Sequence, residues 1–191
     1  MDRPQVFAVV FLAVALLNAQ QSLLFIPAND ASFTITPKRK SYKIGEKIDF
    51  TYRVRNISHA EIFVPRTVWE VKCGNPPHVW AWLEDSTGKH LMPGYAGSCL
   101  GPDPIDKLSA AQRMEKDAVL VKPMAYIEGS FDLDTNIFIK ELKPGRYRLE
   151  AVLYGWKSER FDEAQGLSLE TMKHPFLSGE LAASQSIELT N

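Results

Sequence analysis

The stretch Glu141–Gly155, ELKPGRYRLEAVLYG, constrains the fold of this chain more than any other segment. It opens with Pro144 and Gly145, a pair that favours a turn because proline fixes φ at the second turn position and glycine accepts a positive φ at the third. From Tyr147 onward apolar and polar residues alternate, and Val152 is the one apolar residue on the polar side. A period of two with one polar face is typical of a half-buried antiparallel strand. The segment therefore predicts a β-sandwich.

A second alternating segment, Lys47–Arg55, has four apolar residues on one face and five polar residues on the other. The polar face is expected to meet water. Pro65 cannot donate to a ladder, so the short strand that it ends is expected at a sheet edge. Together with the turn signals between them, these runs predict an all-β Greek-key sandwich. Further segments with strand character span 33–36, 61–65, 78–84, 118–121, 125–133 and 184–190.

The segment Leu142–Tyr147, LKPGRY, resembles the tyrosine corner of immunoglobulin-like and fibronectin-type sandwiches. With Tyr42–Glu46, the strand after it and Asn56, the chain resembles bacterial immunoglobulin-like domains and is loosely similar to the intracellular proteinase inhibitor family. The resemblance implies an immunoglobulin-like Greek-key β-sandwich, and the sequence pattern adds one or two short helices in insertions. It also implies that the hydroxyl of Tyr147 bonds to nearby backbone, with Pro144 and Gly145 shaping the turn.

The N-terminus has the features of an export signal. Arg3 precedes the apolar run Val6–Leu17, and the small residue Ala19 follows. The run is shorter than the roughly 20 residues that span a bilayer, so residues 1–19 are predicted to be a cleaved signal peptide. A retained anchor is the alternative, because Leu23–Ile26 are also apolar. Either outcome predicts an extracytoplasmic protein, secreted or periplasmic, and cleavage would leave no stable membrane span.

The rest of the chain is predicted to be one domain, since 45% hydrophobic residues suit a globular protein. Excess length gathers in two insertions, which either form binding loops or cover an open edge or face of a sheet. Each insertion has a segment with helical features. The expected boundaries are a linker at 20–32, a sandwich at 33–191, insertions at 85–117 and 156–182, and short helices near 109–117 and 158–174.

Cys73 and Cys99 are the two cysteines of the chain. An even number of cysteines in an exported protein predicts a disulfide. The alternative is a metal site with His78 and His90, because thiolate and imidazole bind zinc or copper. The spacing matches no compact metal motif, so neither a metal nor another cofactor is predicted.

Two other motifs have ordinary interpretations as turns. Asp132–Asn136 resembles the start of a calcium loop, but Ile137 replaces the required glycine and Lys143 replaces the final glutamate. Asn56 and Ser58 fit an N-glycosylation triplet, although these residue types also favour a turn.

Aromatic residues are the candidate binding groups. Trp80 and Trp82 share the face of their strand that is opposite Val79, Ala81 and Leu83. They either fill the core or form a platform for sugars or peptides. The aromatic residues of the insertions are further candidates, namely Tyr95, Trp156 and Phe161.

Charge and motifs narrow the function. The net charge of −1 gives no global field that would attract nucleic acid. The basic residues between Lys38 and Lys43 are expected to form a solvated strand edge. No Gly-x-Ser-x-Gly, His-Glu-x-x-His or phosphate-binding glycine loop is present, so no enzyme is predicted.

The sequence predicts an exported, non-catalytic immunoglobulin-like domain that binds a protein or carbohydrate partner. The alternatives are a proteinase inhibitor and a metal-binding protein or hydrolase.

Overall fold

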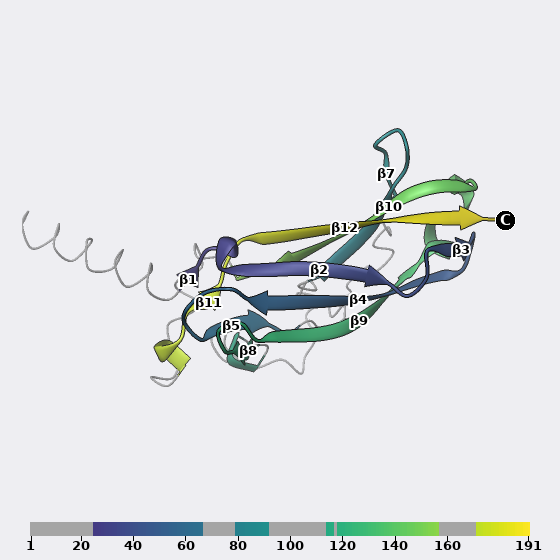
Figure 1. Ribbon diagram of the computed structural model, residues 1–191. Helices are drawn as coiled ribbons and strands as arrows, with labels where there is room; N and C mark the ends of the chain where they lie inside the picture. Colours follow the sequence, from purple (N-terminus) through teal and green to yellow (C-terminus); the bar gives the residue numbers. More distant parts are fainter. Residues whose placement is uncertain (1–24, 67–78, 92–113, 117, 157–170) are drawn as a thin grey trace, which may run out of the picture.

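The structure is a computed structural model that describes residues 25–66, 79–91, 114–116, 118–156 and 171–191 (Figure 1). Two sheets in this part of the chain pack face to face. The first is antiparallel and has the order β2-β4-β9, from strands β2 (Ala31–Pro37), β4 (Lys47–Asn56) and β9 (Tyr126–Asp134). The second has the order β3-β12-β10-β6-β7, from strands β3 (Ser41–Lys43), β12 (Glu180–Thr190), β10 (Gly145–Tyr154), β6 (Val79–Glu84) and β7 (His90–Leu91).

The chain passes from the first sheet to the second between β4 and β6 and again between β9 and β10. The short strand β3 follows β2 in the chain but belongs to the second sheet, where it pairs in parallel with β12. Crossing between two sheets in this way is the Greek-key pattern of immunoglobulin-like folds. The predicted fold class, an immunoglobulin-like β-sandwich, is therefore confirmed.

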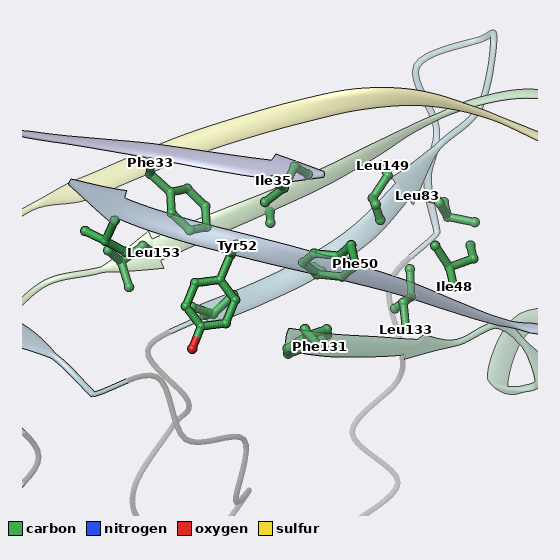
Figure 2. Close-up of a cluster of buried hydrophobic side chains, with 14 of the residues drawn as sticks. Phe33, Ile35, Ile48, Phe50, Tyr52, Leu83, Phe131, Leu133, Leu149 and Leu153 are labelled. Atoms are coloured by element: carbon green, nitrogen blue, oxygen red, sulfur yellow. The ribbon is translucent and has the colours of Figure 1, made fainter. Parts of the chain in front are cut away.

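The core lies between the two sheets, where Figure 2 shows side chains from β2, β4, β6, β9 and β10. The alternation predicted for β4 and β10 is present, since Ile48, Phe50, Leu149 and Leu153 are fully buried. Burying a large apolar side chain contributes about 1.5–3 kcal/mol. The inward faces of these strands thus supply much of the force that holds the sheets together.

A smaller sheet extends one end of the sandwich, opposite the C-terminus (Figure 1). Its order is β1-β11-β5-β8. A second apolar cluster lies against it, in which Phe176 contacts Phe25, Phe63 and Trp156. The four strands are β1 (Phe25–Ile26), β11 (Phe176–Leu177), β5 (Ile62–Pro65) and β8 (Ala118–Val121).

The expectation that Pro65 marks an edge strand is wrong, because β5 lies between β11 and β8. The register gives the physical reason. β11 pairs with β5 only at Phe63, and Pro65 is the last residue of β5, opposite Ala118. Because β11 has only two residues, its ladder with β5 does not reach Pro65.

Several predicted boundaries differ from the described elements. Part of the segment 20–32 is structured, as strand β1 and the 3-10 helix η1 (Ala28–Asp30). The segment 85–117 begins with the hairpin turn into β7, in which the Asp85 amide donates to Lys89. The segment 156–182 contains β11 and the start of β12. Of the predicted helices, 114–116 are helical and η4 (Thr171–Lys173) is a 3-10 turn, and their other residues lie outside the described part. None of the described helices is long and apolar enough to cross a membrane.

Asn56 lies at a bend where the β4–β9 ribbon gives way to the β5–β8 ribbon. Its side chain is fully buried. The Asn56 amide nitrogen donates to the backbone oxygens of Ala60 at 2.7 Å and Val121 at 2.9 Å. Its oxygen accepts from the amide and hydroxyl of Ser58 at 2.9 and 2.7 Å. The triplet that fits a glycosylation acceptor therefore forms a structural turn.

The segment that resembles a calcium loop ends β9 and begins the 3-10 helix η2 (Thr135–Glu141). Its polar side chains bond to the turn between β3 and β4. The Thr135 hydroxyl donates to the Glu46 backbone oxygen at 2.8 Å, and Asn136 donates to that of Gly45 at 2.9 Å. Asp134 caps η2 by accepting from the Asn136 amide. These contacts join the end of β9 to the turn between β3 and β4.

Candidate functional site

The candidate site lies on the outer face of the five-stranded sheet, where β6, β7 and β10 run side by side. Strand alternation sends Val79, Ala81 and Leu83 into the core. Trp80 and Trp82 therefore lie on the opposite face, as the sequence predicted, and both are half-buried.

The strand register brings polar residues beside these tryptophans. Across β10 and β6, Glu150 is opposite Trp82 and Arg148 is opposite Glu84. Across β6 and β7, Glu84 is opposite His90. Residues directly opposite in an antiparallel pair lie on the same face with Cβ atoms about 5 Å apart. We call the following five residues the polar–aromatic cluster: Trp82, Glu84, His90, Arg148 and Glu150.

Arg148 links the two carboxylates of the cluster. Its Nη2 lies 2.7 Å from both oxygens of Glu84, and its Nε lies 2.7 Å from Oε1 of Glu150. Hydrogen bonding from Arg148 lowers the pKa of Glu84 below its ordinary value, and the bond to Glu84 raises the pKa of Arg148. Glu84 and Arg148 therefore stabilise each other in their charged forms.

His90 contacts both the charged group Glu84 and the aromatic ring of Trp82. Its Nε2 lies 3.1 Å from Oε2 of Glu84, and its ring centroid lies 5.7 Å from that of Trp82. The indole Nε1 of Trp82 is buried and has no hydrogen-bond partner among the described residues. A buried N–H without an acceptor is costly, and native structures usually satisfy such a donor. The cluster thus holds one unsatisfied donor next to a charged array.

The same residues include a set of metal-ligand types. Ligand atoms of Glu84, His90 and Glu150 all lie within 4.8 Å of one another. Zinc accepts nitrogen and carboxylate ligands of this kind. However, Arg148 is bonded to both carboxylates, so a cation would have to displace the guanidinium group. The arrangement is better suited to hydrogen bonding than to metal binding.

Trp156, another candidate binding residue, is not brought to this cluster. Trp156 packs edge-on against Phe176, with ring centroids 5.0 Å apart, in the second apolar cluster. Two candidate binding residues and both cysteines lie outside the described residues, so their roles and the disulfide stay predictions. These residues are Tyr95, Phe161, Cys73 and Cys99.

Sequence reasoning missed Glu84, Arg148 and Glu150 as site residues. Each falls on the polar side of a predicted strand, and their opposite charges were a usable signal. The missing information was the register, which decides that Arg148 lies opposite Glu84 and not beside another residue of β6.

Exposed ion pairs also occur elsewhere on the described surface. Arg53 and Glu128 form one on the outer face of the three-stranded sheet, at 2.7 Å. Lys38 and Arg39, from the predicted basic segment, are paired with Asp49 and Glu46. What sets the candidate site apart is that its ion pairs adjoin a half-buried tryptophan with an unsatisfied N–H.

No family model matches the chain, and no curated protein matches it in sequence. Solved structures that match include the CARDB domain of the PF1109 protein from Pyrococcus furiosus, in complex with di-metal ions. It is 12% identical, with a TM-score of 0.37 and coverage of 84% of this chain and 88% of that chain. A β-glucosidase from Erythrobacter marinus is 13% identical with a TM-score of 0.39, and one from Listeria innocua in complex with isofagomine is 12% identical with a TM-score of 0.38. Both match over 84% of this chain but only 15% and 16% of their own, so the chain spans about a sixth of their length. Scores at this level assign neither a family nor a function.

Proposed function

We propose that this protein is an extracytoplasmic, non-catalytic immunoglobulin-like domain that binds a protein or carbohydrate partner through the polar–aromatic cluster. One observation carries the proposal. An indole, an imidazole, a guanidinium and two carboxylates converge on a sheet face that points away from the core.

The cluster presents exposed side chains that are held in place by less exposed ones. The side chains of Arg148 and His90 are 50% and 49% exposed, so both can contact a partner, whereas the carboxylates of Glu84 and Glu150 that hold them are only 16% and 18% exposed. Their mutual bonds hold the side chains in fixed positions. A preorganised surface loses less side-chain entropy when a partner binds.

The extracytoplasmic location rests on the N-terminal sequence. A signal peptide at 1–19 would deliver the folded domain to the periplasm or the medium. Edman sequencing or intact mass of protein from the extracytoplasmic fraction tests this proposal. An N-terminus near Gln20 supports cleavage, whereas an intact Met1 in a membrane fraction supports a retained anchor.

Binding is tested by immobilising the full-length protein and exposing it to envelope and secreted fractions of its native cell. Trp82→Ala and Arg148→Ala change the cluster. Arg53→Ala is the matched control, because it breaks an exposed Arg–Glu pair on the other sheet. We expect both cluster variants to lose capture and the control to retain it, with all four proteins folded by circular dichroism. Equal capture by all four would refute the proposed site.

The similarity to the intracellular proteinase inhibitor family remains a resemblance in sequence. An inhibitor would reduce the activity of purified proteases, and inactivity across a panel of serine, cysteine and metalloproteases would remove that alternative.

A further inference from the structure

We infer that the ligand of the polar–aromatic cluster is an uncharged oligosaccharide that lies across the strands of the five-stranded sheet. The inference rests on the proposed function and names the chemical class of the partner.

Charge is the first argument. Two carboxylates, Glu84 and Glu150, share one guanidinium, that of Arg148. The cluster therefore has one net negative charge when His90 is neutral. This disfavours phosphorylated ligands, acidic peptides and acidic sugars, because like charges repel at short range.

Hydrogen-bonding capacity is the second argument. The side chain of Arg148 is 50% exposed, and its guanidinium offers N–H donors to an acceptor on a ligand. A carboxylate offers about four acceptor positions. Glu84 uses only three of them, for two bonds from Arg148 and one contact with His90. A lysine or arginine side chain has donors only, so it cannot accept a hydrogen bond from the guanidinium of Arg148. A sugar hydroxyl both donates and accepts, and it carries no charge.

Flat surfaces are the third argument. The indole of Trp82 and the imidazole of His90 lie with ring planes 35° apart. Aromatic rings with a polar tip offer an apolar face for the C–H groups of a sugar and a polar edge for its hydroxyls. The planar guanidinium and carboxylate groups beside them bond in fixed directions.

The length of the polar row indicates an oligosaccharide. Ser186 lies opposite Arg148, and Ser184 lies opposite Glu150, so exposed hydroxyls extend the row onto β12. The row then crosses β7, β6, β10 and β12. With neighbouring strands about 4.8 Å apart, it is roughly 14 Å long. An extended ligand can therefore contact both the aromatic end and the serine end.

Binding of defined neutral, anionic and cationic oligosaccharides to the full-length protein is the direct test, on an array and then by tryptophan fluorescence. We expect a subset of neutral oligosaccharides to bind, with an affinity that changes little between low and high salt. Trp82→Ala should weaken binding at least tenfold. Trp82→Phe, which keeps an aromatic ring but removes the N–H, should weaken it less, and Arg53→Ala should leave it unchanged.

The results separate failure of this inference from failure of the proposed function. If capture from native fractions depends on Trp82 and Arg148 but resists competition by neutral oligosaccharides, and falls steeply with salt, then the partner is a charged peptide or protein surface. That result overturns the inference and leaves the proposed function standing. If capture does not depend on the cluster, both are wrong. Neutral oligosaccharides that bind equally well to the wild type and Trp82→Ala would also overturn the inference.

Discussion

The hydroxyl of Tyr147 lies 3.0 Å from the backbone oxygen of Lys143, four residues upstream, and donates to it. The amide of Lys143 donates back to the same hydroxyl at 3.1 Å. The Tyr147 ring is buried at the start of β10, immediately after the Pro144–Gly145 turn. One side chain thus closes the loop that leads into a central strand, which is the geometry of a tyrosine corner.

Tyr147→Phe should lower stability by about 1–3 kcal/mol, because it leaves both backbone groups of Lys143 without this partner. Urea unfolding measures the effect. Tyr126→Phe is the control, since the Tyr126 side chain is exposed, and it should change stability by less than about 0.5 kcal/mol. Equal midpoints for the two variants would show that the corner contributes nothing.

Asn56→Asp should be far more harmful than its small change in shape suggests. In the wild type, the backbone carbonyls of Ala60 and Val121 accept hydrogen bonds from the Asn56 side-chain amide. A carboxylate cannot donate these bonds. An unpaired buried charge costs about 3 kcal/mol or more. Ser58→Ala removes the hydroxyl bonds of Ser58 to Asn56 and Ala60 but leaves its amide bonded to Asn56, so it should cost about 1 kcal/mol. Thermal unfolding of both variants checks this order, and a reversed order would contradict the burial of Asn56.

The strands could be predicted from the sequence because their signal is local. In β4 and β10, alternation alone identifies inward residues such as Phe50 and Leu149. The error at Pro65 has a different origin. Whether a strand lies at an edge depends on segments far away in the chain, here β11, more than 100 residues downstream of β5.

The candidate site was harder to predict for the same reason. Trp80 and Trp82 are two residues apart, so their shared face follows from strand periodicity. The contact of Arg148 with Glu84 joins residues 64 positions apart, and a shift of one residue in register would send the two side chains to opposite faces. Nothing in the local sequence near either residue specifies that register.

Gly129→Ala should destabilise the three-stranded sheet. A Cβ atom at Gly129 would overlap the ring and hydroxyl of Tyr52 on the neighbouring strand. Tyr52 is buried, so the ring cannot simply move into solvent, and overpacking of this kind costs about 1–3 kcal/mol. Denaturant unfolding of a double-mutant cycle with Tyr52→Leu tests the cause. The cost of Gly129→Ala should shrink in the Tyr52→Leu background, and additive costs would show that the two residues do not clash. Ser130→Ala, at the exposed next residue, is the control.

The ion pair between Arg148 and Glu84 should make stability depend on pH in the acid range. Its hydrogen bond lowers the pKa of Glu84 below the ordinary 4.5, so near pH 4 the unfolded state binds more protons than the folded state. The contribution is present above pH 4.5 and is lost as the pH falls through the lowered value. Arg148→Ala should therefore flatten the decline in unfolding free energy between about pH 5 and pH 3. Arg53→Ala breaks a different pair and should not flatten that decline through Glu84. Parallel pH profiles for the wild type and Arg148→Ala would contradict the linkage.

The last prediction is a disulfide between Cys73 and Cys99, both outside the described residues. β7 runs antiparallel to β6, with Leu91 opposite Leu83. Leu91, where β7 ends, precedes Cys99 by eight residues, and Cys73 precedes Val79, where β6 begins, by six residues. Both cysteines thus lie within a few residues of paired strands, and closing the loop between them would stabilise the fold by about 3 kcal/mol in the chain-entropy model. Thiol titration of unfolded, non-reduced protein from the extracytoplasmic fraction should find no free thiol, and the same titration after reduction should find two. The double variant Cys73→Ser with Cys99→Ser should unfold at a lower urea concentration than the oxidised wild type, and at nearly the same concentration as the reduced wild type.

Two free thiols without reduction would disprove the bond. One free thiol per chain would instead indicate pairing between chains, which contradicts the intramolecular prediction equally.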